Sequence, residues 1–244
     1  MELTESNYYS AEADWTFWSV SQYKSFMRCE SAAMAELRGE YKRPVTDALL
    51  LGSYLDSWMD GTLEDFKKEH PELFTKAGNL KAEYRKSDEA IAKISTDELF
   101  MKYISGEHQK ILTFELCGVP WKAKLDSFHE GICIVDLKYV RNYDSLWKYR
   151  YDIQGAVYAY GAEACGYGEL PFYLAAVTKE TIPDCDIFQV LKPQLDIALK
   201  EVTDNMERLI AVKEGLEEPT SCGTCDYCKT VKKASIRDFS KLLL

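Results

Sequence analysis

Residues 121–140 read WKAKLDSFHEGICIVDLKYV, and residues 148–160 read KYRYDIQGAVYAY. The first run predicts two strands joined by a tight turn, and the second predicts a helix. Strand side chains alternate between faces, so Asp136 and Lys138 share one face. A three-residue turn at residues 129–131 places Asp126 on that face too, one diagonal step from Asp136. Two carboxylates and a lysine at the mouth of an apolar hairpin indicate a metal site with a catalytic cation beside it.

The helix adds a polar stripe. Tyr151, Gln154 and Tyr158 recur at i, i+3 and i+7, which places them on one helical face. A tyrosine stripe alone is typical of core packing, but the acids upstream favour a role in the site. The residues between are small, which lets the helix lie close to the sheet: Gly155, Ala156, Ala159, Gly161 and Ala162.

Asp126, then Asp136-Leu137-Lys138, then Gln154-x-x-x-Tyr158 resemble, in this order and on these elements, the PD-(D/E)xK nuclease superfamily. Within it the pattern is most similar to the RecB-like and exodeoxyribonuclease VIII-like exonucleases of phage type. The resemblance implies that Asp126 and Asp136 hold Mg²⁺ or Mn²⁺, with the Leu137 carbonyl as a further ligand. It also implies that Lys138 positions the attacking water or stabilises charge on the phosphate.

Two further roles follow from the same resemblance. Gln154 would orient the lysine or a DNA phosphate, and Tyr158 would contact the DNA backbone. Related exonucleases carry G-x-x-x-H on an earlier helix, with the histidine as a metal ligand; this chain has Gly52 and then Asp56 at the matching place. Aspartate is a competent ligand for a hard divalent ion, so Asp56 is a candidate ligand, although a solvated aspartate on a helix face would read the same way.

Cys222, Cys225 and Cys228 form C-x-x-C-x-x-C, a spacing that local ligand clusters use. In RecB-like nucleases with an iron–sulfur cluster, a fourth cysteine comes from an N-terminal segment similar to the one that holds Cys29. The resemblance therefore implies a 4Fe–4S cluster on these four cysteines, with Zn²⁺ as the alternative. In those nucleases the spacing between the last two C-terminal cysteines is wider than the spacing between Cys225 and Cys228 in this chain. The remaining cysteines are expected to be packing residues: Cys117, Cys133, Cys165 and Cys185.

The chain has 244 residues and a formal net charge of −10, which argues against a generally basic, DNA-coating surface but allows a nuclease with one basic cleft. No apolar run is long enough to cross a bilayer, and no signal peptide opens the sequence. We therefore expect no membrane partner and a cytoplasmic location in a bacterial host cell, where the protein could be encoded by a phage. Eight cysteines in such a chain indicate reduced thiols or metal ligands rather than disulfides.

We predict a single nuclease domain over residues 1–244 with an α/β (α+β) fold: a central mixed sheet flanked by helices around a restriction-endonuclease-like core. A helix from Ser19 to Gly39, a charged helical insertion at 62–106 and a Cys-rich segment at 216–244 surround that core. The Cys-rich segment is expected to pack with residues 19–39 through the bound metal, which would join the termini. Predicted strands span residues 110–118, 120–128, 131–139, 171–179 and 185–191.

The leading hypothesis is a metal-dependent DNA exonuclease acting on linear DNA ends in phage-type recombination or DNA processing. A single-strand annealing or recombination protein would be a further partner, and related exonucleases form homo-oligomeric rings. The competing hypotheses are a catalytically silent DNA-binding or scaffold module of the same fold, and a redox protein built round the cysteines. An intact acid–acid–lysine set argues against the silent module. The redox hypothesis leaves that set unexplained.

Overall fold

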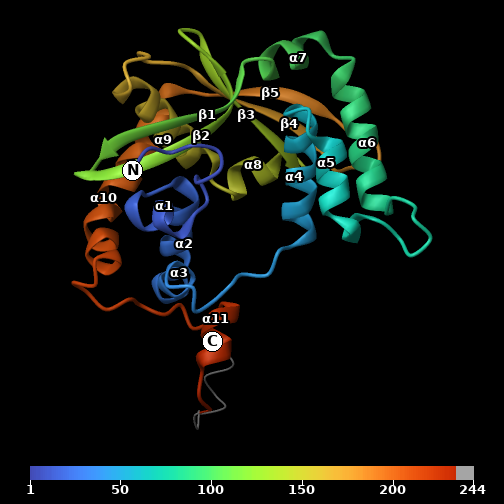
Figure 1. Ribbon diagram of the computed structural model, residues 1–244. Helices are drawn as coiled ribbons and strands as arrows, with labels where there is room; N and C mark the ends of the chain where they lie inside the picture. The colour runs from blue at the N-terminus through green and yellow to red at the C-terminus, as the bar shows by residue number, and fades with distance from the viewer. Residues whose placement is uncertain (235–244) are drawn as a thin grey trace. The chain divides into compact units, whose positions relative to one another are not determined.

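The computed structural model, which describes residues 1–234, contains a five-stranded mixed sheet (Figure 1). Its strands lie in chain order: β1 (Glu107–Leu116), β2 (Val119–His129), β3 (Cys133–Val140), β4 (Phe172–Thr178) and β5 (Cys185–Val190). Only β3 and β4 pair in parallel. A parallel pair needs a long crossover, and the chain supplies it as α8 (Asp144–Lys148) and α9 (Tyr151–Ala164). The predicted mixed sheet with flanking helices is confirmed.

Both hairpin turns differ by a residue from the sequence expectation. The β1–β2 turn is Cys117-Gly118, where both residues have positive φ (56° and 75°), as a two-residue hairpin turn requires. The β2–β3 loop runs over residues 130–132, because His129 pairs with Cys133. The loop keeps three residues, so Asp126 stays on the expected face, but its register position is directly opposite Asp136 rather than diagonal to it.

One sheet face packs on helices from the region before β1. These helices are α4 (Asp47–Met59), α6 (Ala82–Ser95) and α7 (Glu98–Ile104). Their apolar residues Leu55, Ile94 and Phe100 share a core with Val135 and Leu137 of β3. Helix α5 (Leu63–Glu69) and the 3₁₀ turn Pro71–Leu73 pack against α4 and α6 in a separate cluster. The predicted insertion at 62–106 therefore supplies part of the core as well as charged surface.

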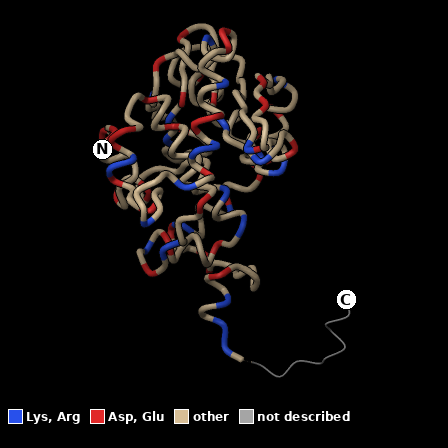
Figure 2. The backbone as a smooth tube through the Cα atoms, turned by 90° about the vertical axis from the view of Figure 1, so that its right-hand side faces the viewer, with Lys and Arg blue, Asp and Glu red and all other residues tan. Residues whose placement is uncertain are grey.

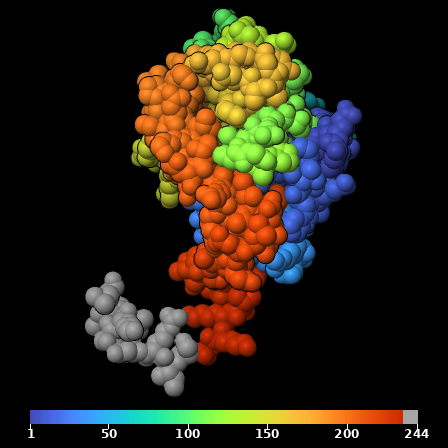
Figure 3. All heavy atoms as spheres, turned by 90° about the vertical axis from the view of Figure 1, so that its left-hand side faces the viewer, coloured from blue at the N-terminus to red at the C-terminus, as the bar shows by residue number. Residues whose placement is uncertain are grey.

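The opposite sheet face carries α9. Glycines at positions 155 and 161 bring its backbone against Phe172 and Phe114, where an added Cβ would meet a ring carbon at 2.4 Å in each case. The start of α10 (Lys192–Lys213) follows β5, and Figure 3 shows these orange residues beside the gold segment that follows α9. The small residues of α9 thus let the helix lie close to the sheet, as predicted from the sequence.

The N-terminal residues join the edge of the β1–β2 hairpin. Helix α1 (Ala11–Thr16) begins at the N-cap Ser10, and Trp18 forms a parallel bridge with Trp121. Lys122 of β2 is buried and lies 2.7 Å from the Asp14 carboxylate. Neither α1 nor α8 is predicted from the sequence, since each helix is too short to show a period.

The chain divides into two compact units, residues 1–20 with 44–206 and residues 21–43 with 207–244. Within the second unit lie α2 (Val20–Arg28), α3 (Glu30–Leu37), the end of α10 and α11 (Asp226–Val231). The helix predicted from Ser19 to Gly39 is wrong in one respect: the backbone at Cys29 is extended (φ −168°, ψ 105°) and separates α2 from α3.

Glu30 joins the ends of the second unit. Its carboxylate accepts hydrogen bonds from Arg208 and from the backbone and hydroxyl of Thr220. The predicted segment 216–244 thus packs with residues 30–31 along its first part, and residues 235–244 lie outside the described residues.

Candidate active site and candidate metal centre

The sheet ladder is interrupted at Asp126. Pairing of β2 with β3 reaches Ser127 opposite Val135 and stops, and pairing with β1 omits Gln109, the residue opposite Asp126. The Leu137 N–H donates instead to Asp126 Oδ2 at 3.0 Å, so a side chain replaces a ladder bond. Because a strand residue directs its N–H and C=O to the same side, the Leu137 carbonyl faces this opening too.

Two acids and a lysine meet at the interruption. Lys138 Nζ lies 2.5 Å from Asp136 Oδ2 and 3.9 Å from Asp126 Oδ2. Asp136 is fully buried, and the Lys138 ammonium is paired with its Oδ2. The three predicted catalytic residues are therefore brought together, with one buried oxygen left to the lysine and to any ligand.

Burial governs the electrostatics here. Loss of water around Asp136 raises the pKa of that carboxyl to about 8, with Lys138 opposing the shift and Asp126 adding to it. Burial works against the charged form of Lys138, but the Asp136 and Asp126 carboxylates outweigh it and raise the pKa of the lysine. The lysine therefore stays a cation across the neutral range.

Gln154 and Tyr158 form the floor of the site. Gln154 Nε2 donates to Asp136 Oδ1 at 2.8 Å and to the Tyr158 hydroxyl at 3.0 Å. The residue expected to orient the lysine or a phosphate thus contacts the acid. The Tyr158 ring is buried and packs edge-on to Phe172, so its hydroxyl faces Gln154 rather than open solvent.

Helix α4 contributes a third acid. Burial raises the pKa of Asp56 to about 7, and the negative charge of Asp126 is the next largest cause. The charges of Asp56 and Asp126 therefore interact. Asp60, the C-cap residue of α4, lies one turn after Asp56, and Gln109 Nε2 donates to its Oδ1 at 3.3 Å. Gln109 itself has a positive φ of 56° beside the ladder interruption. The sequence reasoning missed Asp60 and Gln109, although the i, i+4 spacing of Asp56 and Asp60 offered a signal.

The donor set fits a hard divalent ion. Asp126 and Asp136 offer carboxylate oxygens, Leu137 offers a carbonyl, and oxygen ligands are what Mg²⁺ and Mn²⁺ prefer. The fully buried Asp136 carboxylate, whose Oδ2 faces the Lys138 ammonium without an aligned hydrogen bond, is the observation that supports this fit. Among the ion pairs within residues 1–234, Lys138 Nζ is the cation that pairs with both carboxylates.

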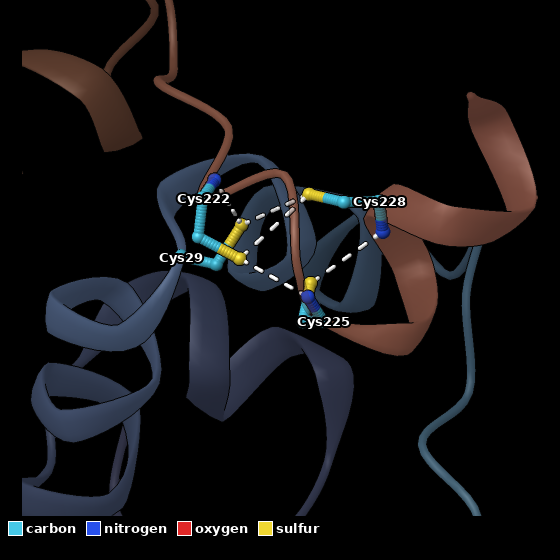
Figure 4. Close-up of side chains that lie close together, drawn as sticks. All are labelled: Cys29, Cys222, Cys225 and Cys228. Carbon is cyan, nitrogen blue, oxygen red and sulfur yellow. Dashed lines mark hydrogen bonds between the residues drawn. The ribbon is translucent and has the colours of Figure 1, made fainter. Parts of the chain in front are cut away.

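The second site is a four-cysteine cluster in the smaller unit (Figure 4). The Sγ atoms of Cys29, Cys222, Cys225 and Cys228 all lie within 4.8 Å of one another. Cys29 Sγ lies 3.6 Å from Cys228 Sγ, and Cys222 Sγ lies 3.9 Å from Cys228 Sγ. The extended backbone at Cys29 turns that thiol toward the C-terminal cysteines. A metal ion could be held here by all four thiols.

Backbone donors surround the sulfurs. The N–H of Cys222 points to Cys29 Sγ, that of Cys225 to Cys222 Sγ, and that of Cys228 to Cys225 Sγ, at 3.3–3.4 Å. Hydrogen bonds from Thr224 and Cys225 lower the pKa of the Cys222 thiol to about 5. Donors of this kind stabilise thiolates, the form that binds metal.

Two of the other cysteines are not packing residues as expected. Cys117 lies exposed in the β1–β2 turn and Cys165 is exposed after α9, whereas Cys133 is buried. Their exposed thiols lie outside the four-cysteine cluster.

Comparison with known proteins identifies a matching family and a similar solved structure. The sequence matches a family described as "PDDEXK-like domain of unknown function (DUF3799)" over residues 19–231. A solved structure from Eubacterium rectale, described as "Putative exonuclease", is 41% identical, with a TM-score of 0.95, and the match covers 100% of this chain and 98% of that chain. The solved structure of SSO0001 is 11% identical over 89% of this chain and 96% of that chain, and its TM-score of 0.35 carries no argument. No curated protein matches the sequence.

The match spans the interrupted ladder, the acid–lysine set and all four clustered cysteines. The chain belongs to the family of PDDEXK-like domains.

Proposed function

We propose that this chain is a DNA exonuclease that requires Mg²⁺ or Mn²⁺. The observation that carries the proposal is the meeting of Asp126, Asp136 and Lys138 at the interrupted β2–β3 ladder. The family match and the solved relative support a nuclease. Digestion from DNA ends rests on the resemblance and on the name of that relative, and a role in phage-type recombination or DNA processing rests on the resemblance alone.

Asp126, Asp136 and the Leu137 carbonyl would hold the divalent ion, with Asp56 as a further ligand. When bound, such an ion lowers the pKa of a water and offsets the charge that builds on the phosphate. Lys138 is a flexible cation that would place the water or stabilise the phosphate oxygens, at the atom Nζ. Gln154 would hold the Asp136 carboxylate in position, and Tyr158 would hold Gln154.

The test is cleavage of end-labelled linear DNA, with circular DNA of the same sequence as the control substrate. We expect degradation of the linear form with Mg²⁺ or Mn²⁺, none with EDTA, and an intact circular form. Asp136→Asn and Lys138→Met should each lower turnover by at least about a thousandfold, since each removes a group that touches the reacting atoms. The matched control is Lys200→Met, an exposed lysine on α10, which should cleave as the wild type does.

Near wild-type turnover in the Asp136→Asn protein would refute the site assignment. A folded wild-type protein that binds DNA but cleaves none with either metal would favour the silent scaffold module instead.

We also propose that the four cysteines hold Zn²⁺. In a tetrahedral site with Zn–S bonds near 2.3 Å, neighbouring sulfurs lie about 3.8 Å apart. The 3.6 and 3.9 Å separations here support that size, whereas a four-iron cluster binds each thiolate at a different iron and spreads the sulfurs more widely. The resemblance implies the cluster, and the separations support the zinc alternative.

Anaerobic purification followed by metal analysis tests this second proposal. We expect colourless protein with one zinc per chain. Brown protein with about four irons and four sulfides per chain, absorbing broadly in the visible blue, would establish the iron–sulfur cluster instead.

A further inference from the structure

The segment that follows the site is basic and aromatic. Residues 138–151 read KYVRNYDSLWKYRY, with four Lys or Arg, one Asp and five aromatic residues in a chain whose net charge is −10. Aromatic rings interleaved with cations are typical of surfaces that track single-stranded nucleic acid.

The structure exposes two of these rings. Helix α8 buries Ser145 and Leu146 and turns Trp147 outward, so that Trp147 is 66% exposed and Tyr149 is 56% exposed. Water-exposed aromatic faces on a short helix contribute little to folding. More than half of each side chain is exposed, which is enough surface for a ligand with a flat face to contact.

Arg150 holds the segment in place. Its backbone is in the left-handed region (φ 52°, ψ 52°), an unfavourable conformation for a side chain of this size. The guanidinium donates to the Asp152 carboxylate at 3.0–3.2 Å and to the Glu201 carboxylate at 2.8–3.1 Å. Two carboxylates from α9 and α10 thus fix the junction between Tyr149 and Tyr151.

The junction connects the exposed rings to the site. The Tyr149 and Tyr151 ring centroids lie 6.2 Å apart, and Lys138 Nζ lies 5.0 Å from the Tyr151 centroid. The exposed Tyr149 is therefore connected to the catalytic lysine through the Tyr151 ring. Arg141 and Lys148, on the same segment, are exposed cations that complement a phosphate backbone.

We propose that Trp147 and Tyr149 form a stacking platform for the unpaired bases of a DNA strand that ends in the site. The proposal rests on the proposed function and adds a preference for single-stranded or frayed ends. Bases within a duplex keep their faces stacked on each other, so only unpaired bases can use exposed rings. Arg150 acts as a positioning residue for the platform.

The experiment measures binding without cleavage. Fluorescein-labelled single-stranded DNA and the blunt duplex of the same length are titrated in EDTA with wild type, with Trp147→Ala/Tyr149→Ala, and with Trp15→Ala. Trp15 is 43% exposed on α1 and serves as the matched control for loss of a surface tryptophan. Circular dichroism confirms that each variant is folded, and Trp147→Phe/Tyr149→Phe tests rescue by rings that still stack.

We expect the double alanine variant to bind single strands roughly tenfold to a hundredfold more weakly and the blunt duplex less than about threefold more weakly. The phenylalanine pair and Trp15→Ala should bind as wild type does. Binding of single strands should quench tryptophan emission in the wild type and not in Trp147→Phe, because the stacked indole is then absent.

Unchanged single-strand affinity in the double alanine variant, an equal loss on the blunt duplex, or a wild type that does not bind single strands would each overturn the platform. These readings are made in EDTA and stand apart from the cleavage assay. An inactive enzyme with the expected binding pattern would refute the proposed activity alone, and an active enzyme without that pattern would refute the platform alone.

Discussion

At the scale of single residues, the site depends on a carboxylate whose surroundings oppose its charge. Asp136 lies fully buried, with Lys138 2.5 Å from one oxygen and Gln154 2.8 Å from the other. A buried charged pair of this kind is weak evidence for stability, since desolvation offsets the attraction. Its position at an interrupted ladder fits a chemical role better than a structural one.

Gln154 and Tyr158 should act as one unit on Asp136. Gln154→Leu removes the hydrogen bond to the carboxylate, and we expect turnover to fall roughly tenfold to a hundredfold, about 1–3 kcal/mol for a buried partner left unsatisfied. Tyr158→Phe removes only the hydroxyl that accepts from Gln154 and should cost less. Single-turnover cleavage of linear DNA measures both.

The double variant Gln154→Leu/Tyr158→Phe is the decisive comparison. Because both residues act through Asp136, its loss should be close to that of Gln154→Leu alone. Additive losses would mean that Tyr158 works separately, for example through DNA.

At the scale of elements, α9 reaches the acids only because it lies close to the sheet. Gly155 faces the Phe172 ring and Gly161 faces the Phe114 ring, each at 2.4 Å from an added Cβ. Alanine would stabilise an isolated helix, by about 1 kcal/mol, but here it overpacks the interface.

Gly155→Ala and Gly161→Ala form a matched pair. Each should lower the free energy of unfolding by about 1–3 kcal/mol, measured by urea denaturation. Gly155 adjoins Gln154, so Gly155→Ala should also lower turnover, whereas Gly161→Ala lies almost two turns away and should keep it. Equal activity in both variants would contradict the argument that this close approach sets the position of Gln154.

The β1–β2 turn offers an independent element-scale prediction. Cys117 has φ 56° in a two-residue turn with Gly118, and Asn-Gly is the pair that such turns favour. Cys117→Asn should raise the free energy of unfolding by about 0.5–1 kcal/mol, because asparagine tolerates positive φ. Cys117→Ala is the control and should give no gain, since alanine lacks that tolerance; a gain of the same size there would point to removal of the thiol as the cause.

At the scale of the whole molecule, cysteines make the hydrogen-bond contact that joins the most distant positions within residues 1–234. Cys29 and Cys228 are 199 positions apart, and their sulfurs lie 3.6 Å from each other. Closing a loop of this length costs chain entropy, which metal–thiolate bonds can offset.

Lys and Arg positions and Asp and Glu positions are interspersed along the backbone (Figure 2). None of the helices within residues 1–234 has the length and apolar character needed to cross a membrane.

Cys29→Ser should lose the metal as fully as Cys225→Ser does. Each variant removes one of four thiolates, and metal-binding free energy at a structural site is on the order of 10 kcal/mol of folding free energy. Metal content of purified protein is the measurement, with Cys165→Ser, an exposed thiol outside the cluster, as the control that should keep its metal. Full occupancy in Cys29→Ser with loss in Cys225→Ser would remove Cys29 from the site.

Local patterns in the sequence were enough for the strands, for the shared face of Asp126, Asp136 and Lys138, and for the stripe on α9. Strand alternation and helical spacing are properties of the backbone, and they hold before any tertiary contact forms. The C-x-x-C-x-x-C run is local in the same way. Cys29 entered through a resemblance, because no local rule links residues so far apart.

Tertiary structure decided the rest. The extended backbone at Cys29, within a run of good helix formers, brings its thiol to the C-terminal cysteines, so long-range contacts override helix propensity there. The register that would set Asp126 opposite Asp136 depends on which residues close the loop, a shift of one position that composition does not decide. Which atom Gln154 contacts, and the recruitment of Asp60 and Gln109, depend on packing between elements, because a side chain's partners across a fold leave no period in the sequence.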